Sequence, residues 1–526
     1  MLEGADLGAA NRTDNWELRS GKSEIGFDPR GSGVEGRRTR PTVSVEISSR
    51  DIRLGPALKS RLSPKETALT IAALAAALLV YWLLHQRYYL SYVDDAWCVS
   101  QAHFFFATGK TEDYLFRAPD APDRVLVFFR TYLYLYGAVL NWLGWTKSNA
   151  LILSSLFIWL SAAIWFFICR RLKFSATLQA LIPVSMLLFP AYFSAAHLAR
   201  YDALVFFLSS LSFLCFLCRR FLLAGVFLVI GMECHPMGVA AAFYILSYVV
   251  SDRTAFFADR RKLLRIAALF SAGAALGLCY VWWLHPDLSF ERVRTTLAID
   301  RSMNNFAFGF IGKYFTDSYW YRHDWELPLI LGAVALFIKH RLWKRNAFPA
   351  IFLVAMIICS FTVGRANANY MVFAFPAFSV LMFSTFEELQ MLGKVVPAIG
   401  VVLAVLYGVH YGLRHDFDFN RITAETRASL VNPSLPVIGM PDNWFAVPER
   451  QFYPIYPSVS WIPRLGLKEF YLVRNDYISN ESANYHALIA TLHQTHDCVS
   501  IRHFKGFRDQ DVEIFQCSDK VPDGKP

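Results

Sequence analysis

Two adjacent carboxylates, Asp94 and Asp95, stand a few residues after an apolar run that ends near Leu84. Adjacent acids repel each other, so the pKa of one rises unless a cation or a metal ion keeps both ionised. A carboxylate in a partly buried cleft can accept a proton from a hydroxyl nucleophile, which is the work of a general base. The acids could instead cap the following segment Ala96–Gly109, although a cap uses one Asp and not two. The pair is our first candidate for catalytic residues.

Arg200 and Asp202 flank Tyr201 at the end of another apolar run. An arginine at such a boundary can bind a phosphate, and an aspartate beside it can orient the arginine or hold an acceptor. The alternative is a local ion pair that only closes the loop. The sequence leaves both alternatives open.

Two further polar positions interrupt the apolar sequence. His235 precedes Pro236, and irregular backbone at membrane depth is tolerated where it lines a cavity. A purely structural histidine is the alternative. Arg365 suits a lipid-linked phosphate near the outer interface, with Tyr370 beside it as a hydrogen-bond donor. A snorkelling arginine next to an aromatic-belt tyrosine would give the same pattern.

The composition indicates what kind of scaffold holds these residues. Hydrophobic residues make up 55% of the 526 residues and charged residues 18%, and the mean hydropathy is +0.32. A soluble domain cannot bury that much apolar surface, so we predict an α-helical polytopic membrane protein. The net charge of +10 does not indicate nucleic-acid binding, because the Lys and Arg residues fall mostly in short clusters between apolar runs.

Apolar runs that could enter the membrane recur along most of the chain. They lie near 67–84, 126–143, 149–169, 176–194, 202–218, 221–234, 237–250, 264–284, 325–338, 346–363, 370–386 and 395–413. If all of them crossed, basic clusters would fall on both sides of the membrane. If 126–143 rests on the outer surface instead, the basic clusters are all cytoplasmic and about eleven crossings remain. Every polar group named above then faces outward.

Changes in composition divide the chain into three parts. Residues 1–62 are rich in Gly, Arg, Ser and Asp and predict a disordered cytoplasmic tail. Residues 63–415 form the transmembrane domain, with 85–148 as its first outer loop, and 416–526 predict a small extracytoplasmic α/β domain. The strands expected there are Lys468–Arg474, Cys498–Phe504 and Val512–Ser518, and the helix is Ser482–Gln494.

Cys498 and Cys517 lie on two of those expected strands and could meet across a hairpin. Outside the cytoplasm a disulfide between them is one outcome, and two unpaired thiols are the other. Cys215 and Cys218 form one Cys-x-x-Cys pair, but they lie in an apolar run, and no second pair or His/Cys cluster completes the spacing of a zinc site.

Taken together, these motifs resemble the GT-C superfamily of membrane glycosyltransferases, and within it the protein O-mannosyltransferases and the lipid A aminoarabinose transferase. The resemblance covers about residues 67–415 and is carried by four motifs in family order: Asp94-Asp95, Arg200–Asp202, His235–Gly238 and Asn369–Pro376. The sequence departs from the family at two places. Ala118–Phe129 replaces a His/Glu-Pro/Lys-Pro-Leu signature, and Arg124 could substitute there. Asn369 stands where the family has Arg, with Arg365 one turn earlier.

The resemblance implies a GT-C fold and an inverting transfer of a hexose or pentose from a polyprenyl-phosphate donor to an extracytoplasmic glycan, lipid or protein. By that resemblance Asp94 is the base, and Asp95 orients the acceptor or a metal. The residues implied at the donor phosphate are Arg200, Asp202, His235, Arg365, Tyr370 and Arg124. A divalent metal would use Asp95 and Asp202; whether one takes part stays open.

The implied location is the bacterial inner membrane, with the site on its periplasmic face. Two rival functions stay open. In a transporter Asp94 and Asp95 would form a coupling site, although transporters usually hold such charges near the bilayer midplane. A membrane protein that binds the lipid carrier without catalysis is the other.

Overall fold

The computed structural model describes residues 93–110, 115, 129–286, 289–291, 294, 309–316, 326–362, 368–396, 398–399, 419–455, 462–475, 483–506 and 511–520. The predicted tail 1–62, the apolar run 67–84 and most of the run 395–413 lie outside these residues. Two predicted site residues, Arg124 and Arg365, lie outside them as well.

The described part between residues 93 and 399 is helical. Its helices are α2 (Val93–Thr108), α3 (Arg130–Leu143), α4 (Lys147–Arg171), α5 (Ala176–Leu188), α6 (Pro190–Ala196), α7 (Asp202–Leu217), α8 (Phe221–Cys234), α9 (Ala240–Ser251), α10 (Arg253–Phe257), α11 (Arg260–Leu284), α13 (Gly309–Thr316), α15 (Glu326–Lys339), α16 (Phe348–Thr362) and α17 (Met371–Glu388), with short 3-10 turns that include η1 (Pro236–Val239) and η3 (Ala368–Tyr370). Within the described residues α4, α11 and α17 are long and apolar enough to cross a membrane.

Local sequence signals set several helix ends. Thr146 begins α4 by accepting a hydrogen bond from the Asn149 backbone, and Asp259 caps α11 through the backbone N–H groups of Arg261 and Lys262. The predicted run 176–194 is not one helix, because Pro190 lacks a backbone donor and begins a new helix, α6, directly after Phe189. In the same way Pro236 separates α8 from η1 and α9.

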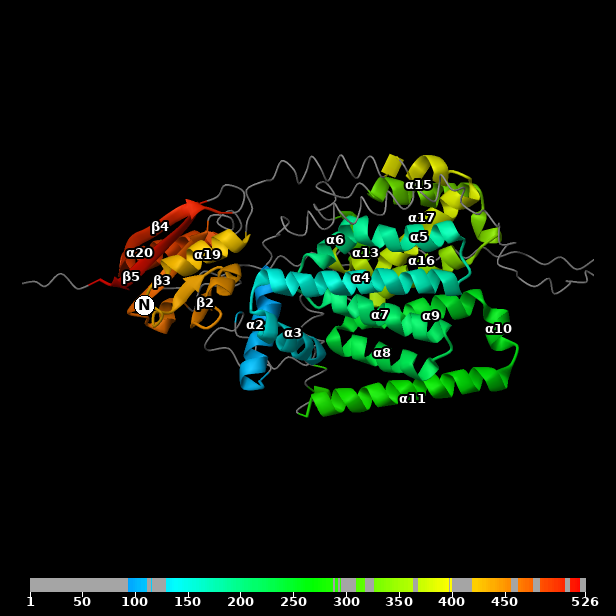
Figure 1. The fold of residues 1–526 in the computed structure, drawn as a ribbon, viewed down its shortest axis with the longest axis horizontal. Helices are drawn as coiled ribbons and strands as arrows, with labels where there is room; N and C mark the ends of the chain where they lie inside the picture. Colours follow the sequence, from blue (N-terminus) through cyan, green and yellow to red (C-terminus); the bar gives the residue numbers. More distant parts are fainter. Residues whose placement is uncertain are drawn as a thin grey trace, which may run out of the picture. The chain divides into compact units, whose positions relative to one another are not determined.

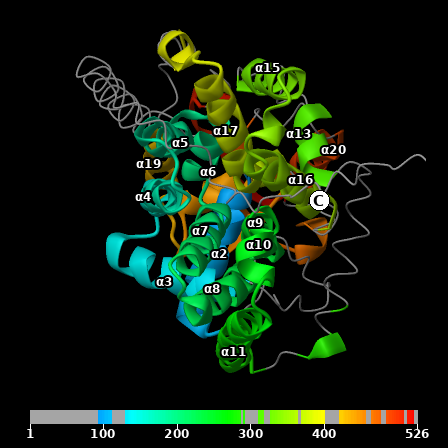
Figure 2. The same cartoon turned by 90° about the vertical axis from the view of Figure 1, so that its right-hand side faces the viewer.

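Helices α4, α7, α8 and α11 pack in a row, each against the next (Figure 1; Figure 2). Helices α8 and α11 approach closely at Gly273, where an added Cβ would lie 1.9 Å from the Leu222 carbonyl oxygen. Helices α5, α6, α16 and α17 lie on the other side of α4 and α7, and α17 is buried along most of its length.

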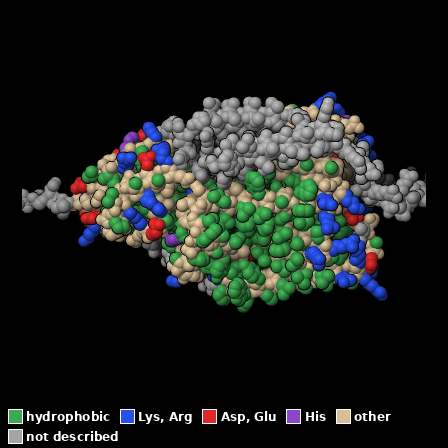
Figure 3. Space-filling view, in the orientation of Figure 1, with side chains coloured by type: hydrophobic (Ala, Val, Ile, Leu, Met, Phe, Trp, Pro, Cys, Tyr) green, Lys and Arg blue, Asp and Glu red, His purple; other side chains and the backbone are tan. Residues whose placement is uncertain are grey.

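The exposed basic residues gather at one end of these helices, beside α10, while apolar side chains cover the helix faces (Figure 3). They include Arg170, Arg171, Lys173, Arg219, Arg220, Arg253, Arg260, Arg261, Lys262, Arg341, Lys344 and Arg345. Asp202 begins α7 and Tyr370 precedes α17, and both of these helices end among the basic loops. Asp94, Arg200, Asp202, His235 and Tyr370 therefore lie at the end opposite these basic residues. Which side of a membrane this end faces stays a prediction.

The stretch that was expected to rest on the membrane surface forms α3. Its 14 residues span about 21 Å, but α8 and α15 have the same length, so length does not separate this helix from those expected to cross. Tyr132 and Tyr136 on one side are buried, whereas Tyr134 and Trp142 on the other are exposed. Whether this segment crosses the membrane stays a prediction.

The C-terminal part contains a five-stranded mixed sheet in the order β2-β1-β3-β5-β4. The strands are β1 (Val437–Gly439), β2 (Phe452–Pro454), β3 (Glu469–Asn475), β4 (His496–Lys505) and β5 (Asp511–Asp519), with helices α19 (Phe419–Ser429) and α20 (Ala483–Thr495). Strands β1, β2 and β3 are parallel, and β5 runs antiparallel to β3 and β4.

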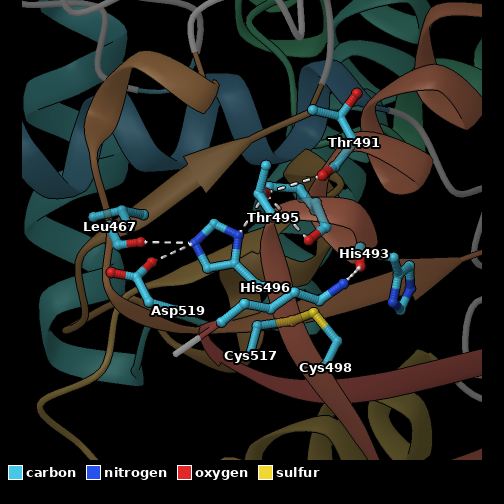
Figure 4. The surroundings of a disulfide bond; sticks show 10 residues. Leu467, Thr491, His493, Thr495, His496, Cys498, Cys517 and Asp519 are labelled. Atoms are coloured by element: carbon cyan, nitrogen blue, oxygen red, sulfur yellow. Dashed lines mark hydrogen bonds and ion pairs between the residues drawn. A yellow bond between two sulfur atoms is a disulfide. The ribbon is translucent and has the colours of Figure 1, made fainter. Parts of the chain in front are cut away.

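The core of this sheet follows the alternation of side chains along β3. Leu472 packs with residues of α20 on one face, and Tyr471 packs with residues of α19 on the other. The predicted strands β3, β4 and β5 and the helix α20 are confirmed, whereas β1, β2 and α19 were not predicted. Cys498 and Cys517 are directly opposite on β4 and β5, and the structure joins them in a disulfide (Figure 4).

Candidate active site

Arg200 holds two carboxylates at the end of the helices opposite the basic loops. Its Nη1 donates to Asp94 Oδ2 at 2.7 Å, and its Nε lies 2.9 Å from Asp202 Oδ2. Arg200 and Asp202 are 2% exposed, whereas the Asp94 side chain is 27% exposed. The local ion pair that the sequence offered as an alternative does form, and Asp94 from α2 joins it.

Asp95 is buried and pairs with Lys147 instead of Arg200. Its Oδ2 lies 3.0 Å from Lys147 Nζ, and both side chains are fully buried. Burial raises the pKa of Asp95 to about 7; Lys147 lowers it, and Asp442 of the C-terminal part raises it. The two adjacent acids therefore have different environments, although both lie in the first turn of α2. Asp94 is the one that a ligand can reach.

The second oxygen of Asp95 fixes the backbone next to Arg200. Asp95 Oδ1 accepts a hydrogen bond from the Ala199 N–H at 2.7 Å. The Tyr132 hydroxyl donates to the carbonyl oxygen of the same residue at 3.0 Å. Both polar groups of Ala199 are thus satisfied by side chains, a strong restraint for a buried loop that carries an arginine.

His235 is a buried link between three segments. Its Nδ1 accepts from the Met237 N–H, so the ring proton of the neutral imidazole is on Nε2, which lies 3.1 Å from the Tyr370 hydroxyl. The ring also stacks on Tyr201 at 4.4 Å between centroids. His235 therefore connects the residue beside Arg200 to the residue that begins the late membrane segment.

Glu233 forms a neighbouring polar cluster that the sequence did not single out. Its two carboxylate oxygens accept from the backbone N–H groups of Arg130 and Thr131, so a residue of α8 caps α3. His285 at the end of α11 lies 2.8 Å from the same carboxylate, and Arg130 donates to the Leu284 carbonyl oxygen. This cluster fixes α3 against the ends of α8 and α11.

The structure brings Asp94, Arg200 and Asp202 into one cluster. Asp95 contacts the backbone next to Arg200. His235 stacks on Tyr201, beside Arg200, and contacts Tyr370. The two expected metal ligands, Asp95 and Asp202, lie against Lys147 and Arg200. The described residues contain no group of three His, Cys, Asp or Glu side chains placed to hold a metal ion.

Lys147 was missed, although its position carried a signal. It is the first residue of α4, where the helix dipole disfavours a cation. A buried lysine in that place requires an acid from elsewhere in the chain. The sequence shows a lysine at the start of an apolar run, but it does not indicate which acid pairs with that lysine.

The described fold is similar to that of a solved structure. ArnT from Cupriavidus metallidurans, solved with bound undecaprenyl phosphate, aligns over 86% of this chain and 98% of its own, with 14% sequence identity and a TM-score of 0.53. The chain has the GT-C fold.

The apo oligosaccharyltransferase from Archaeoglobus fulgidus aligns over 88% of this chain and 76% of its own, with 12% identity and a TM-score of 0.48. No family model matches the sequence, and no curated protein matches it. The GT-C fold and its apolar helices make this chain an integral, multi-pass membrane protein.

Proposed function

We propose that this protein is an inverting glycosyltransferase that moves a hexose or pentose from a polyprenyl-phosphate donor to an acceptor outside the cytoplasm. The observation that carries the proposal is the cluster of Asp94, Arg200 and Asp202 at the end of the helices opposite the basic loops. A lipid-phosphate donor stays in the bilayer while its sugar meets a polar acceptor, so such an enzyme needs its site at the outer interface. In a bacterium this is the periplasmic face of the inner membrane.

The chemistry divides between Asp94 and Arg200. The acceptor hydroxyl attacks the anomeric carbon and gives its proton to Asp94, which is the exposed acid of the pair. The bond from that carbon to the phosphate oxygen breaks, and its electron pair goes to the phosphate. Arg200 stabilises the charge that develops on this leaving group. Attack from the face opposite the phosphate inverts the anomeric carbon.

The remaining residues bind and orient. Asp202 holds the Arg200 guanidinium through Nε. A donor phosphate would share Nη1 with Asp94 and Nη2 with the Tyr201 hydroxyl. The Tyr370 hydroxyl, which His235 Nε2 contacts, is a second donor for the phosphate. Arg124 and Arg365 are proposed donor-phosphate ligands on the basis of the sequence alone.

The direct test incubates purified protein with a panel of polyprenyl-phosphate hexoses and pentoses and measures release of the carrier phosphate. The Asp94→Asn variant is expected to lose turnover by a factor of about 10² to 10⁴. It should still bind undecaprenyl phosphate, because Arg200 is unchanged. Asp497→Asn is the matched control, since Asp497 is exposed on β4 away from the cluster.

Two results would argue against the proposal. Turnover in Asp94→Asn equal to that of the wild type would remove Asp94 from the mechanism. Binding of undecaprenyl phosphate without release from any donor in the panel would favour the alternative, a carrier-binding protein without catalysis.

A further inference from the structure

Lys147 is a buried cation whose position is costly. It is fully buried at the first residue of α4, where both desolvation and the helix dipole act against a positive charge. The ring of Phe419, the first residue of α19, lies over Lys147 Nζ at 4.5 Å from the ring centroid. Beside it, Ser148 donates to Asn420 Oδ1, so this end of α4 is covered by the C-terminal part. A buried positive charge at this position needs an acidic partner to offset the cost of burial.

A continuous set of contacts leads from Lys147 to Arg200. Lys147 Nζ lies 3.0 Å from one oxygen of Asp95, and the other oxygen accepts the Ala199 N–H at 2.7 Å. Ala199 precedes Arg200 in the chain, and its carbonyl oxygen accepts from Tyr132. We propose that Lys147 is a positioning residue for Arg200 that acts through Asp95 and the Ala199 peptide.

The physical reason is the strength of the bond between Asp95 and Ala199. A carboxylate accepts a backbone N–H roughly twice as strongly as a neutral acceptor does. Burial favours the neutral form of Asp95, and Lys147 opposes it. Without Lys147 the pKa of Asp95 rises further. At about pH 8, where the wild-type carboxyl group is mostly ionised, the variant then keeps its proton, the bond to Ala199 weakens, and the loop that carries Arg200 gains freedom.

The first measurement does not depend on enzymatic activity. Hydrogen–deuterium exchange of the peptide that contains Ala199 is compared in the full-length wild type, Lys147→Met, Asp95→Asn and the double variant. We expect the Ala199 amide to exchange at least about tenfold faster in all three variants. Lys344→Met is the control, because Lys344 is exposed at the basic end of the helices. Unchanged exchange in Lys147→Met would overturn the proposal.

The second measurement rests on the proposed function and uses turnover per folded molecule, counted by the stoichiometry of undecaprenyl phosphate binding. Arg200 is proposed to act on the leaving group, so each single variant should lower kcat by about 10-fold to 100-fold and change KM little. Because both residues act through one bond, the double variant should be no slower than either single variant. If the reductions in kcat of the two single variants multiply in the double variant, Lys147 acts independently of Asp95 and the Ala199 peptide.

The two measurements separate the two proposals. If the wild type transfers no sugar, the proposed function fails, and the exchange measurement still decides the role of Lys147. If Lys147→Met does not fold, the double variant removes both buried charges and is compared with Asp95→Asn. Equal exchange in those two supports the proposal, and faster exchange in the double variant contradicts it.

Discussion

Arg200 and Asp94 are 106 positions apart in the chain, and the arginine donates to the aspartate at 2.7 Å. Through Nε the same guanidinium also holds Asp202 at 2.9 Å. One cation therefore connects the proposed base to the residue that begins α7. In the proposed reaction a phosphate that binds Arg200 would share the guanidinium with Asp94. Donor binding would then be coupled to the protonation state of the proposed base.

The first prediction concerns the shape of this cation. Arg200→Lys keeps the charge, but a lysine ammonium cannot span two carboxylates with the fixed geometry of a guanidinium. Turnover is expected to fall by a factor of about 10² to 10³, with a smaller change in the KM for the donor. Steady-state kinetics check this, with Arg170→Lys at the basic end as the control. Turnover in Arg200→Lys within twofold of the wild type would contradict it.

The second prediction concerns pH and Asp95. Its pKa is raised from 3.8 to about 7, first by burial. Between those values the folded protein keeps the proton that the unfolded chain has lost, so the folded state binds more protons and its stability falls as pH rises.

Thermal unfolding of the wild type and Asp95→Asn in detergent measures this effect. The asparagine amide of the variant does not titrate, whereas most other titratable groups are the same in both proteins. The difference in stability between the two proteins at each pH therefore reports mainly on Asp95. Lys147, Asp442, Asp94 and Arg200 are the charged groups nearest to Asp95 in these contacts and are present in both proteins. As pH rises from about 5 to about 8, the wild type should lose stability relative to the variant. A difference that is constant over that range would contradict the raised pKa.

The third prediction concerns the cap of α3. Glu233→Gln places an amide NH₂ where a carboxylate oxygen accepts a backbone N–H, so at least one N–H group of Arg130 or Thr131 loses its acceptor. The expected loss of stability is about 1 to 3 kcal/mol. Amide exchange should increase at the start of α3 and stay unchanged in α16. Glu388→Gln, at the far end of α17, is the control. Equal protection of α3 in Glu233→Gln would show that the cap contributes nothing.

The fourth prediction concerns the disulfide of the C-terminal sheet. Cys498 and Cys517 close a loop with a sequence separation of 19 residues. Replacing both with Ala should lower the free energy of unfolding of this part by about 3 kcal/mol, through the greater entropy of the open unfolded chain. Denaturant unfolding followed by proteolysis of β4 and β5 measures the loss. Cys279→Ala, an exposed free cysteine of α11, is the control and should leave the sheet unaffected.

The sequence determined the membrane class, most helix positions and the end of the helices at which the polar groups gather. These features follow from hydropathy, from proline and capping residues, and from the placement of Lys and Arg between apolar runs, all of which act over a few residues. Asp94, Arg200 and Asp202 could be predicted as a group because one topology places all three on the outer face.

Only the tertiary structure decided which acid is exposed and which is buried. Asp94 and Asp95 are neighbours in sequence, but the helical rotation between adjacent residues sends one toward Arg200 and the other toward Lys147. The Glu233 cap of α3 and the contact between His235 and Tyr370 likewise join residues more than 100 positions apart. Such contacts depend on which helix faces meet in the packed protein, and no local pattern encodes that choice.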